Sequence, residues 1–95
     1  MKLIVSEAAI ADLARLRAFL ADQNRAAADR AVSALIRAAH SLEAMPERGR
    51  PTAVHNIREL IAPFGQSFYV LRYAFHAEAE EVVVLRIWHG RELRE

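Results

Sequence analysis

The spacing of apolar residues changes once along this chain of 95 residues, at the segment MPERGRPT, residues 45–52. Before this segment, apolar residues recur every three or four positions, which is the period of an amphipathic helix. After it, apolar and polar residues alternate, which is the period of half-buried strands. Two prolines and a glycine predict that the segment itself is a loop. A chain of this length forms one domain, so both patterns must share one core.

The first half of the chain predicts a short strand followed by two helices. The strand is KLIV, residues 2–5, and Ser6 after it is a good helix N-cap. Polar residues at 21–25 separate the helices, and so short a link predicts an antiparallel hairpin. The expected apolar stripes are Ile10, Leu13, Leu16, Phe19 and Leu20 on the first helix, and Ala28, Val32, Leu35, Ala39 and Leu42 on the second.

The second half predicts three strands, at residues 56–62, 67–75 and 81–88. The fold class is therefore expected to be α+β, as a single domain over residues 1–95, in the order β-α-α-β-β-β. Its antiparallel helix hairpin packs on one face of a small, mostly antiparallel sheet.

Side-chain alternation sorts the last two strands into two faces. The odd positions are expected to face the helices, namely Tyr69, Leu71, Tyr73, Phe75, Val83, Leu85 and Ile87. The even positions are expected on the other face, namely Phe68, Val70, Arg72, Ala74, Val82, Val84, Arg86 and Trp88.

A hairpin centred on Ala79 would place Arg72 opposite Arg86, and like charges opposed across strands repel. Arg58, at an even position of the preceding strand, is expected to join this face. A functional reading assigns these arginines to a charged partner. The plainer reading pairs each of them with a carboxylate such as Glu59, Glu81 or Glu92.

Composition narrows the class of protein. The chain has no cysteine, which excludes disulfides and thiolate chemistry, and a net charge of +1 argues against a general polyanion binder. The N-terminal apolar run meets Glu7 too early for a signal peptide, so a cytoplasmic protein is expected. His40, His55 and His76 fit no metal-ligand spacing, and we expect no metal and no cofactor.

Several short motifs, in their order and spacing, resemble the RelE/ParE superfamily of bacterial toxins over essentially the whole chain. They are GRPT at residues 49–52, IREL at 57–60, YVLRY at 69–73 and VLRIWHGR at 84–91. The resemblance implies a toxin that causes growth arrest or plasmid stabilisation and is silenced by a cognate antitoxin. It also implies a hetero-oligomer, often two toxins on an antitoxin dimer.

The superfamily has two branches with different targets. RelE-like toxins cut messenger RNA in the ribosomal A site, commonly with mid-chain lysines and a C-terminal tyrosine. Here Lys2 is the sole lysine and no tyrosine follows Tyr73, while the ending HGR resembles the ParE-like branch, which poisons DNA gyrase without nuclease activity. We therefore expect a gyrase poison and no enzyme. The alternatives are a ribosome-dependent endonuclease and a degenerate antitoxin-binding protein without toxicity.

The candidate site residues follow from these readings. Trp88 would be an interface anchor or an edge-of-core residue, and Gly90 would permit a tight turn. The target-binding candidates are Arg86, Trp88, His89, Gly90 and Arg91. The antitoxin-binding candidates are Arg58, Arg72 and Arg86. A nuclease would use His89 as base and Arg58, Arg72 and Arg86 as cations.

Overall fold

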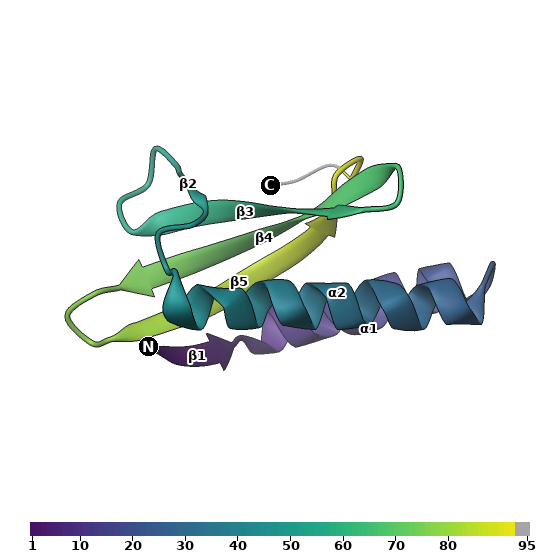
Figure 1. The fold of residues 1–95 in the computed structure, drawn as a ribbon, viewed down its shortest axis with the longest axis horizontal. Helices are drawn as coiled ribbons and strands as arrows, with labels where there is room; N and C mark the ends of the chain where they lie inside the picture. Colours follow the sequence, from purple (N-terminus) through teal and green to yellow (C-terminus); the bar gives the residue numbers. More distant parts are fainter. Residues whose placement is uncertain (93–95) are drawn as a thin grey trace.

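Two helices lie side by side on one face of a five-stranded sheet in the computed structural model, which describes residues 1–92 (Figure 1). This arrangement confirms the expected α+β fold class. The elements in chain order are β1 (Lys2–Val5), α1 (Glu7–Ala21), α2 (Arg25–Ala44), β2 (Arg50–Pro51), β3 (Ile57–Phe64), β4 (Ser67–His76) and β5 (Glu81–His89).

The strands lie in the order β1-β5-β4-β3-β2. Only β1 and β5 run parallel, and the other three pairs are antiparallel, so the sheet is mostly antiparallel as expected. The two-residue strand β2 lies inside the segment 45–52 that we expected to be entirely loop. It forms because Arg50 and Pro51 pair with Glu59 and Arg58 of β3.

Helix α1 begins at Ser6, the N-cap that we expected, and α2 begins at Asn24. The Ser6 Oγ accepts the Ala9 N–H at 3.1 Å, and the Asn24 Oδ1 accepts the Ala27 N–H at 3.0 Å. Each contact satisfies a backbone donor that the first turn of a helix leaves unpaired.

The core lies between the helices and the sheet, and small residues let these layers approach closely. The buried apolar residues of the helices are Ala9, Leu16, Ala28, Ala31, Leu35, Ala39 and Leu42. Ile10 and Phe19, which we expected on the buried stripe of α1, are instead 55% and 64% exposed. The stripe is shifted because Ala9 and Asp12, rather than Ile10, face the sheet.

A β-bulge in β5 reverses the expected order of its faces. Arg72 pairs with Arg86, but the next residue of β4, Tyr73, pairs with Val84, so Leu85 is an extra residue. Val82 and Val84 therefore lie in the core, not on the face of the arginines as expected, whereas Val83 and Leu85 do not. Ile87, beyond the bulge, faces the helices as expected.

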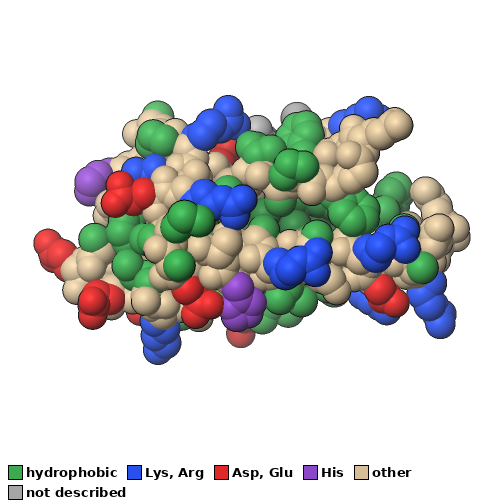
Figure 2. Space-filling model, viewed as in Figure 1, with side chains coloured by type: hydrophobic (Ala, Val, Ile, Leu, Met, Phe, Trp, Pro, Cys, Tyr) green, Lys and Arg blue, Asp and Glu red, His purple; other side chains and the backbone are tan. Residues whose placement is uncertain are grey.

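Charge is unevenly distributed along the molecule. In Figure 2 several acidic side chains gather at the left end, where Figure 1 places the turn between β4 and β5. That turn and the start of β5 contain Glu78, Glu80 and Glu81.

Within residues 1–92, neither helix is long and apolar enough to cross a membrane.

Candidate functional site

Arg72, Arg86 and Trp88 form a cluster on the sheet face that points away from the helices. We call it the arginine–tryptophan stack. Arg72 and Arg86 are directly opposed across β4 and β5, as expected. Their guanidinium carbons lie 4.7 and 5.2 Å from the centroid of the Trp88 ring. The negative face of an aromatic ring attracts cations, so the shared ring reduces the cost of opposing two like charges.

Each arginine of the stack also binds a carboxylate. The Arg72 Nε and Nη2 donate to the Glu59 Oε2 at 3.1 and 2.9 Å. The Arg86 Nε and Nη2 donate to the two Asp12 oxygens at 2.8 and 3.1 Å. Both arginines therefore pair with carboxylates, as one of our two interpretations predicted. Glu59 was among the expected partners, but Asp12 of α1 was not.

Asp12 joins α1 to the open edge of β5. Beyond Val84, β1 no longer covers this edge. The Asp12 Oδ2 accepts the Ile87 N–H at 2.8 Å, and the Ser6 Oγ donates to the Leu85 carbonyl at 2.9 Å. Side chains of the helix thereby replace a neighbouring strand, which leaves less free edge for aberrant pairing.

The Asp12 carboxylate is only 4% exposed and remains negatively charged. Burial on its own would raise its pKa, but hydrogen bonds from Arg86, the Ile87 N–H and Arg15 outweigh burial and lower the pKa below 3.8. Sequence reasoning missed this residue. The available signal was an aspartate on the apolar face of α1, three residues after Ala9 and four before Leu16.

Arg58 does not join the stack, which corrects our expectation. It is opposed to Tyr73, whose side chain lies in the core on the helix side, whereas its neighbour Glu59 is opposed to Arg72. The Arg58 Nη1 donates to the Gly49 carbonyl at 2.7 Å and to the Glu47 carbonyl at 3.1 Å. Arg58 therefore holds the segment between α2 and β2.

Tyr73 binds the same segment from the core side. Its hydroxyl accepts the Gly49 N–H at 2.8 Å and donates to the Pro46 carbonyl at 2.7 Å. Burial raises the pKa of this hydroxyl, so the proton that it donates is retained at neutral pH. A Cβ added at Gly49 would lie 2.6 Å from the Tyr73 oxygen, so only glycine fits this approach.

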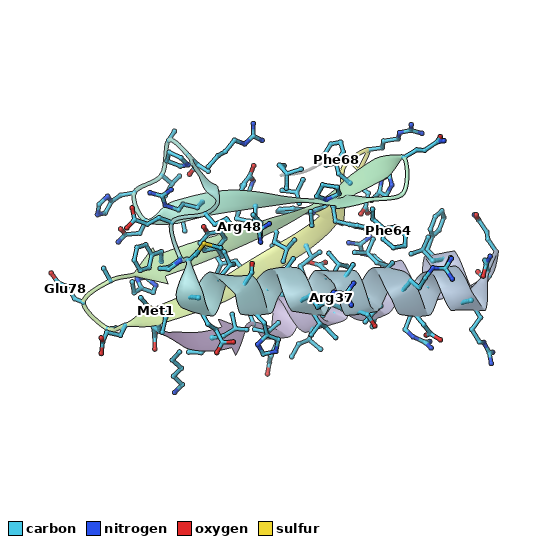
Figure 3. The ribbon with its side chains drawn as sticks, viewed as in Figure 1. Met1, Arg37, Arg48, Phe64, Phe68 and Glu78 are labelled. Atoms are coloured by element: carbon cyan, nitrogen blue, oxygen red, sulfur yellow. The ribbon has the colours of Figure 1, made fainter. Side chains whose placement is uncertain are left out.

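His89, the last residue of β5, lies in a groove with a volume of about 840 Å3. Its Nδ1 accepts the Arg91 N–H at 3.1 Å, so the neutral ring donates from Nε2 to the Ser67 Oγ, 2.9 Å away. The ring also meets Tyr69 edge-on, with 5.4 Å between centroids. The groove runs between α1 and the β3–β4 turn, near Phe64, which Figure 3 labels.

Gly90 follows in a turn, as expected, but its role differs from the one we expected. Among the described glycines only Gly65 has a positive φ, so Gly90 does not supply unusual backbone freedom. Its N–H donates to the Phe68 carbonyl at 2.8 Å, and a Cβ there would lie 2.4 Å from the Phe68 ring. Gly90 is therefore needed for close approach to β4.

The structure divides the four candidate nuclease residues among three places. Arg72 and Arg86 lie on the outer face, in the stack. Arg58 lies on the helix side beside the segment 45–50, and His89 lies in the groove at the end of β5. The target-binding candidates, by contrast, follow one another along the end of β5, where Arg86 and Arg91 are exposed and Trp88 is 5% exposed.

These features define a small α+β domain with two surfaces at its last strand, the arginine–tryptophan stack and the groove. Comparison with known proteins identifies the family. Residues 3–94 match the family model described as ParE toxin of the type II toxin-antitoxin system, parDE. The chain belongs to this family, and its resemblance to RelE/ParE superfamily toxins is thereby confirmed.

Two curated relatives come from Caulobacter vibrioides. Toxin RelE1 is 42% identical over 91 residues, which are 96% of this chain and 95% of the relative. Toxin RelE3 is 39% identical over 83 residues, 87% of each chain. A solved structure described as the chromosomal ParDE TA system from P. aeruginosa has a TM-score of 0.77 at 23% identity and covers 94% of this chain and 95% of that one. That likeness shows a shared fold.

Proposed function

We propose that this toxin poisons DNA gyrase and acts without nuclease chemistry. The observation that carries the proposal is the separation of Arg58, His89 and the arginine–tryptophan stack. Metal-free RNA cleavage needs a base, an acid and cations around a single phosphate. Arg58 instead binds backbone carbonyls, and the His89 ring binds Ser67 and the Arg91 N–H. These contacts suit a framework better than a shared catalytic centre.

The end of β5 is the proposed gyrase-binding surface. Arg86 and Arg91 are exposed and can contact the target directly. Trp88 is buried, so its role is to support the guanidinium of Arg86. His89 and Gly90 keep the turn that carries Arg91 close to β4, through Ser67 and Phe68.

The arginine–tryptophan stack is the proposed binding surface for the antitoxin. Acidic side chains of an antitoxin segment would compete with Glu59 and Asp12 for the guanidinium groups, and aliphatic side chains would cover the surrounding surface. Arg58, the third candidate, lies on the other side of the sheet and would contribute only through the segment 45–50. The proposed complex is a hetero-oligomer, a heterotetramer of two toxins on an antitoxin dimer.

The second candidate is a ribosome-dependent endonuclease of the RelE type. The observation in its favour is that both curated relatives, at 42% and 39% identity, are named RelE toxins. In this case His89 would be the base, after releasing one of its two hydrogen bonds, and Arg72 and Arg86 would hold the phosphate.

A paired assay tests the proposal. The purified chain is added to a gyrase supercoiling reaction and, separately, to a coupled translation reaction in which the ends of the message are mapped. We expect inhibited supercoiling or trapped cleavage complexes, with intact message. Message cut at ribosomes, with gyrase unaffected, would establish the RelE-type activity instead.

A further inference from the structure

The arginines of this chain divide into two groups according to their partners. Arg15, Arg17, Arg58, Arg72 and Arg86 each lie within 4.0 Å of a carboxylate oxygen. Among residues 1–92, the structure gives no such carboxylate to six exposed arginines. Three of them are Arg25, Arg50 and Arg91, and the other three, Arg30, Arg37 and Arg48, lie on or next to α2. These last three are the α2 arginine row.

The row lies along one side of α2. Arg30 and Arg37 are seven residues apart, two turns of helix, and therefore project in nearly the same direction about 10 Å apart. The Arg48 Nη1 donates to the Ser41 Oγ at 2.6 Å and so attaches a third guanidinium to the same side, roughly 16 Å along the axis from Arg30. Figure 2 shows blue side chains spaced across this face, and Figure 3 labels Arg37 and Arg48.

The side chains within the row are small or polar. Ser33, Ala34 and Ser41 share this side of the helix, and the acidic residues of α2, Asp29 and Glu43, project about 80° to 140° away. Asp29 is moreover paired with Arg17, and Glu43 with His40. Between Arg30 and Arg37 the row therefore contains no acidic and no large apolar side chain. Glu47 and the exposed Met45 lie beside Arg48, at the end of the row.

The net charge of +1 argues against polyanion binding by the chain as a whole, but the row gathers exposed cations on one side of α2. We propose that the α2 arginine row binds the phosphate backbone of duplex DNA without sequence preference. A row of roughly 16 Å exceeds the width of either groove, so its two ends can reach phosphates on both strands. Arginine and serine side chains are suited to phosphate oxygens. An amphipathic acidic protein segment would require apolar contacts between the cations, and none lies between Arg30 and Arg37. This binding is separate from gyrase poisoning and does not depend on it.

The test measures binding of the full chain to a labelled 30-base-pair duplex by fluorescence anisotropy over a series of salt concentrations. The row variant is Arg30→Gln with Arg37→Gln. The matched control is Arg25→Gln with Arg50→Gln, which removes the same charge from exposed arginines that have no carboxylate partner among the described residues. Glutamine favours helix nearly as well as arginine, and circular dichroism checks that both variants fold.

We expect the row variant to bind at least tenfold more weakly at low salt. Its plot of log affinity against log salt should be shallower by about 1.8, the value for two lost phosphate contacts. The control should match the parent chain. Equal losses in both variants, or no binding by the parent, would overturn the proposal. It would also fail if duplex RNA or a polyglutamate peptide bound more tightly than DNA through the same two arginines.

Discussion

At the scale of single residues, Asp12 connects more of the molecule than any other side chain described above. Its carboxylate binds Arg86 of the arginine–tryptophan stack, the backbone of Ile87 and Arg15 on the wall of the groove. It is the one charged residue buried within residues 1–92. The position of Arg86, and with it the end of β5, therefore depends on a residue of α1.

Replacing Asp12→Asn should lower the free energy of unfolding by about 2 kcal/mol, because charge-assisted hydrogen bonds to a buried carboxylate are lost. Urea denaturation measures the change. The control is Asp29→Asn, which breaks the exposed ion pair with Arg17 and should cost about 0.5 kcal/mol or less. Equal effects of the two substitutions would contradict the structural role of Asp12.

The same carboxylate predicts a dependence of stability on pH. Since the pKa of Asp12 is lowered in the folded state, its contribution is fully present above its ordinary value of 3.8 and is lost as the pH falls through the folded-state value. The stability difference between the parent chain and Asp12→Asn should therefore shrink in acid. A difference that stays constant between pH 6 and pH 2 would show that the charge of Asp12 contributes nothing.

At the scale of elements, local patterns predicted type and order well. Strand β1 coincides with the expected KLIV, and both helices and the three long strands lie within about two residues of their expected positions. The bulge at Leu85 could not be predicted, because alternation assumes an unbroken ladder. The face of Arg58 could have been predicted. The two-residue turn Gly65–Gln66 pairs Phe64 with Ser67, which sets even positions of β3 opposite odd positions of β4.

Two glycines test how tightly the elements approach one another. Gly49→Ala should cost about 2 kcal/mol, because its Cβ would meet the buried Tyr73 ring and hydroxyl and the backbone of β3. Gly90→Ala should cost less than about 1 kcal/mol, because the half-exposed Phe68 ring can move aside. The midpoints of urea unfolding compare the two variants. The reverse order would mean that the turn after β5 is packed more tightly than the segment 45–50.

At the scale of the whole molecule, one apolar core supports several surfaces that carry arginines. The helix–sheet core is apolar, while the outer sheet face, the end of β5 and the α2 arginine row carry arginines. The alternation of polar and apolar residues and the C-terminal motif predicted arginines on the outer sheet face and at the end of β5. In the α2 arginine row, the helical period places Arg30 and Arg37 on one side, but the position of Arg48 could not be predicted, because it depends on a hydrogen bond to Ser41 from outside the helix.

The affinity for the antitoxin should fall when an arginine of the arginine–tryptophan stack is replaced, but not when an arginine elsewhere is replaced. We expect Arg72→Gln to weaken binding of the cognate antitoxin roughly tenfold, because one charge-assisted hydrogen bond is lost. Calorimetry gives the affinity. Arg17→Gln is the control, since Arg17 also pairs with one carboxylate but lies on α1. If both substitutions had the same effect, the antitoxin would be attracted by overall charge alone.

The most direct test of the proposed function is a gyrase supercoiling titration with three proteins: the parent chain, Arg91→Glu and Arg25→Glu. Both arginines are exposed, and the described contact of Arg91 uses only its backbone N–H, so neither substitution should unfold the chain. We predict that the parent and Arg25→Glu inhibit gyrase alike, and that Arg91→Glu needs at least tenfold more protein. Full inhibition by Arg91→Glu, or none by the parent chain, would contradict the assignment of the β5 end to gyrase.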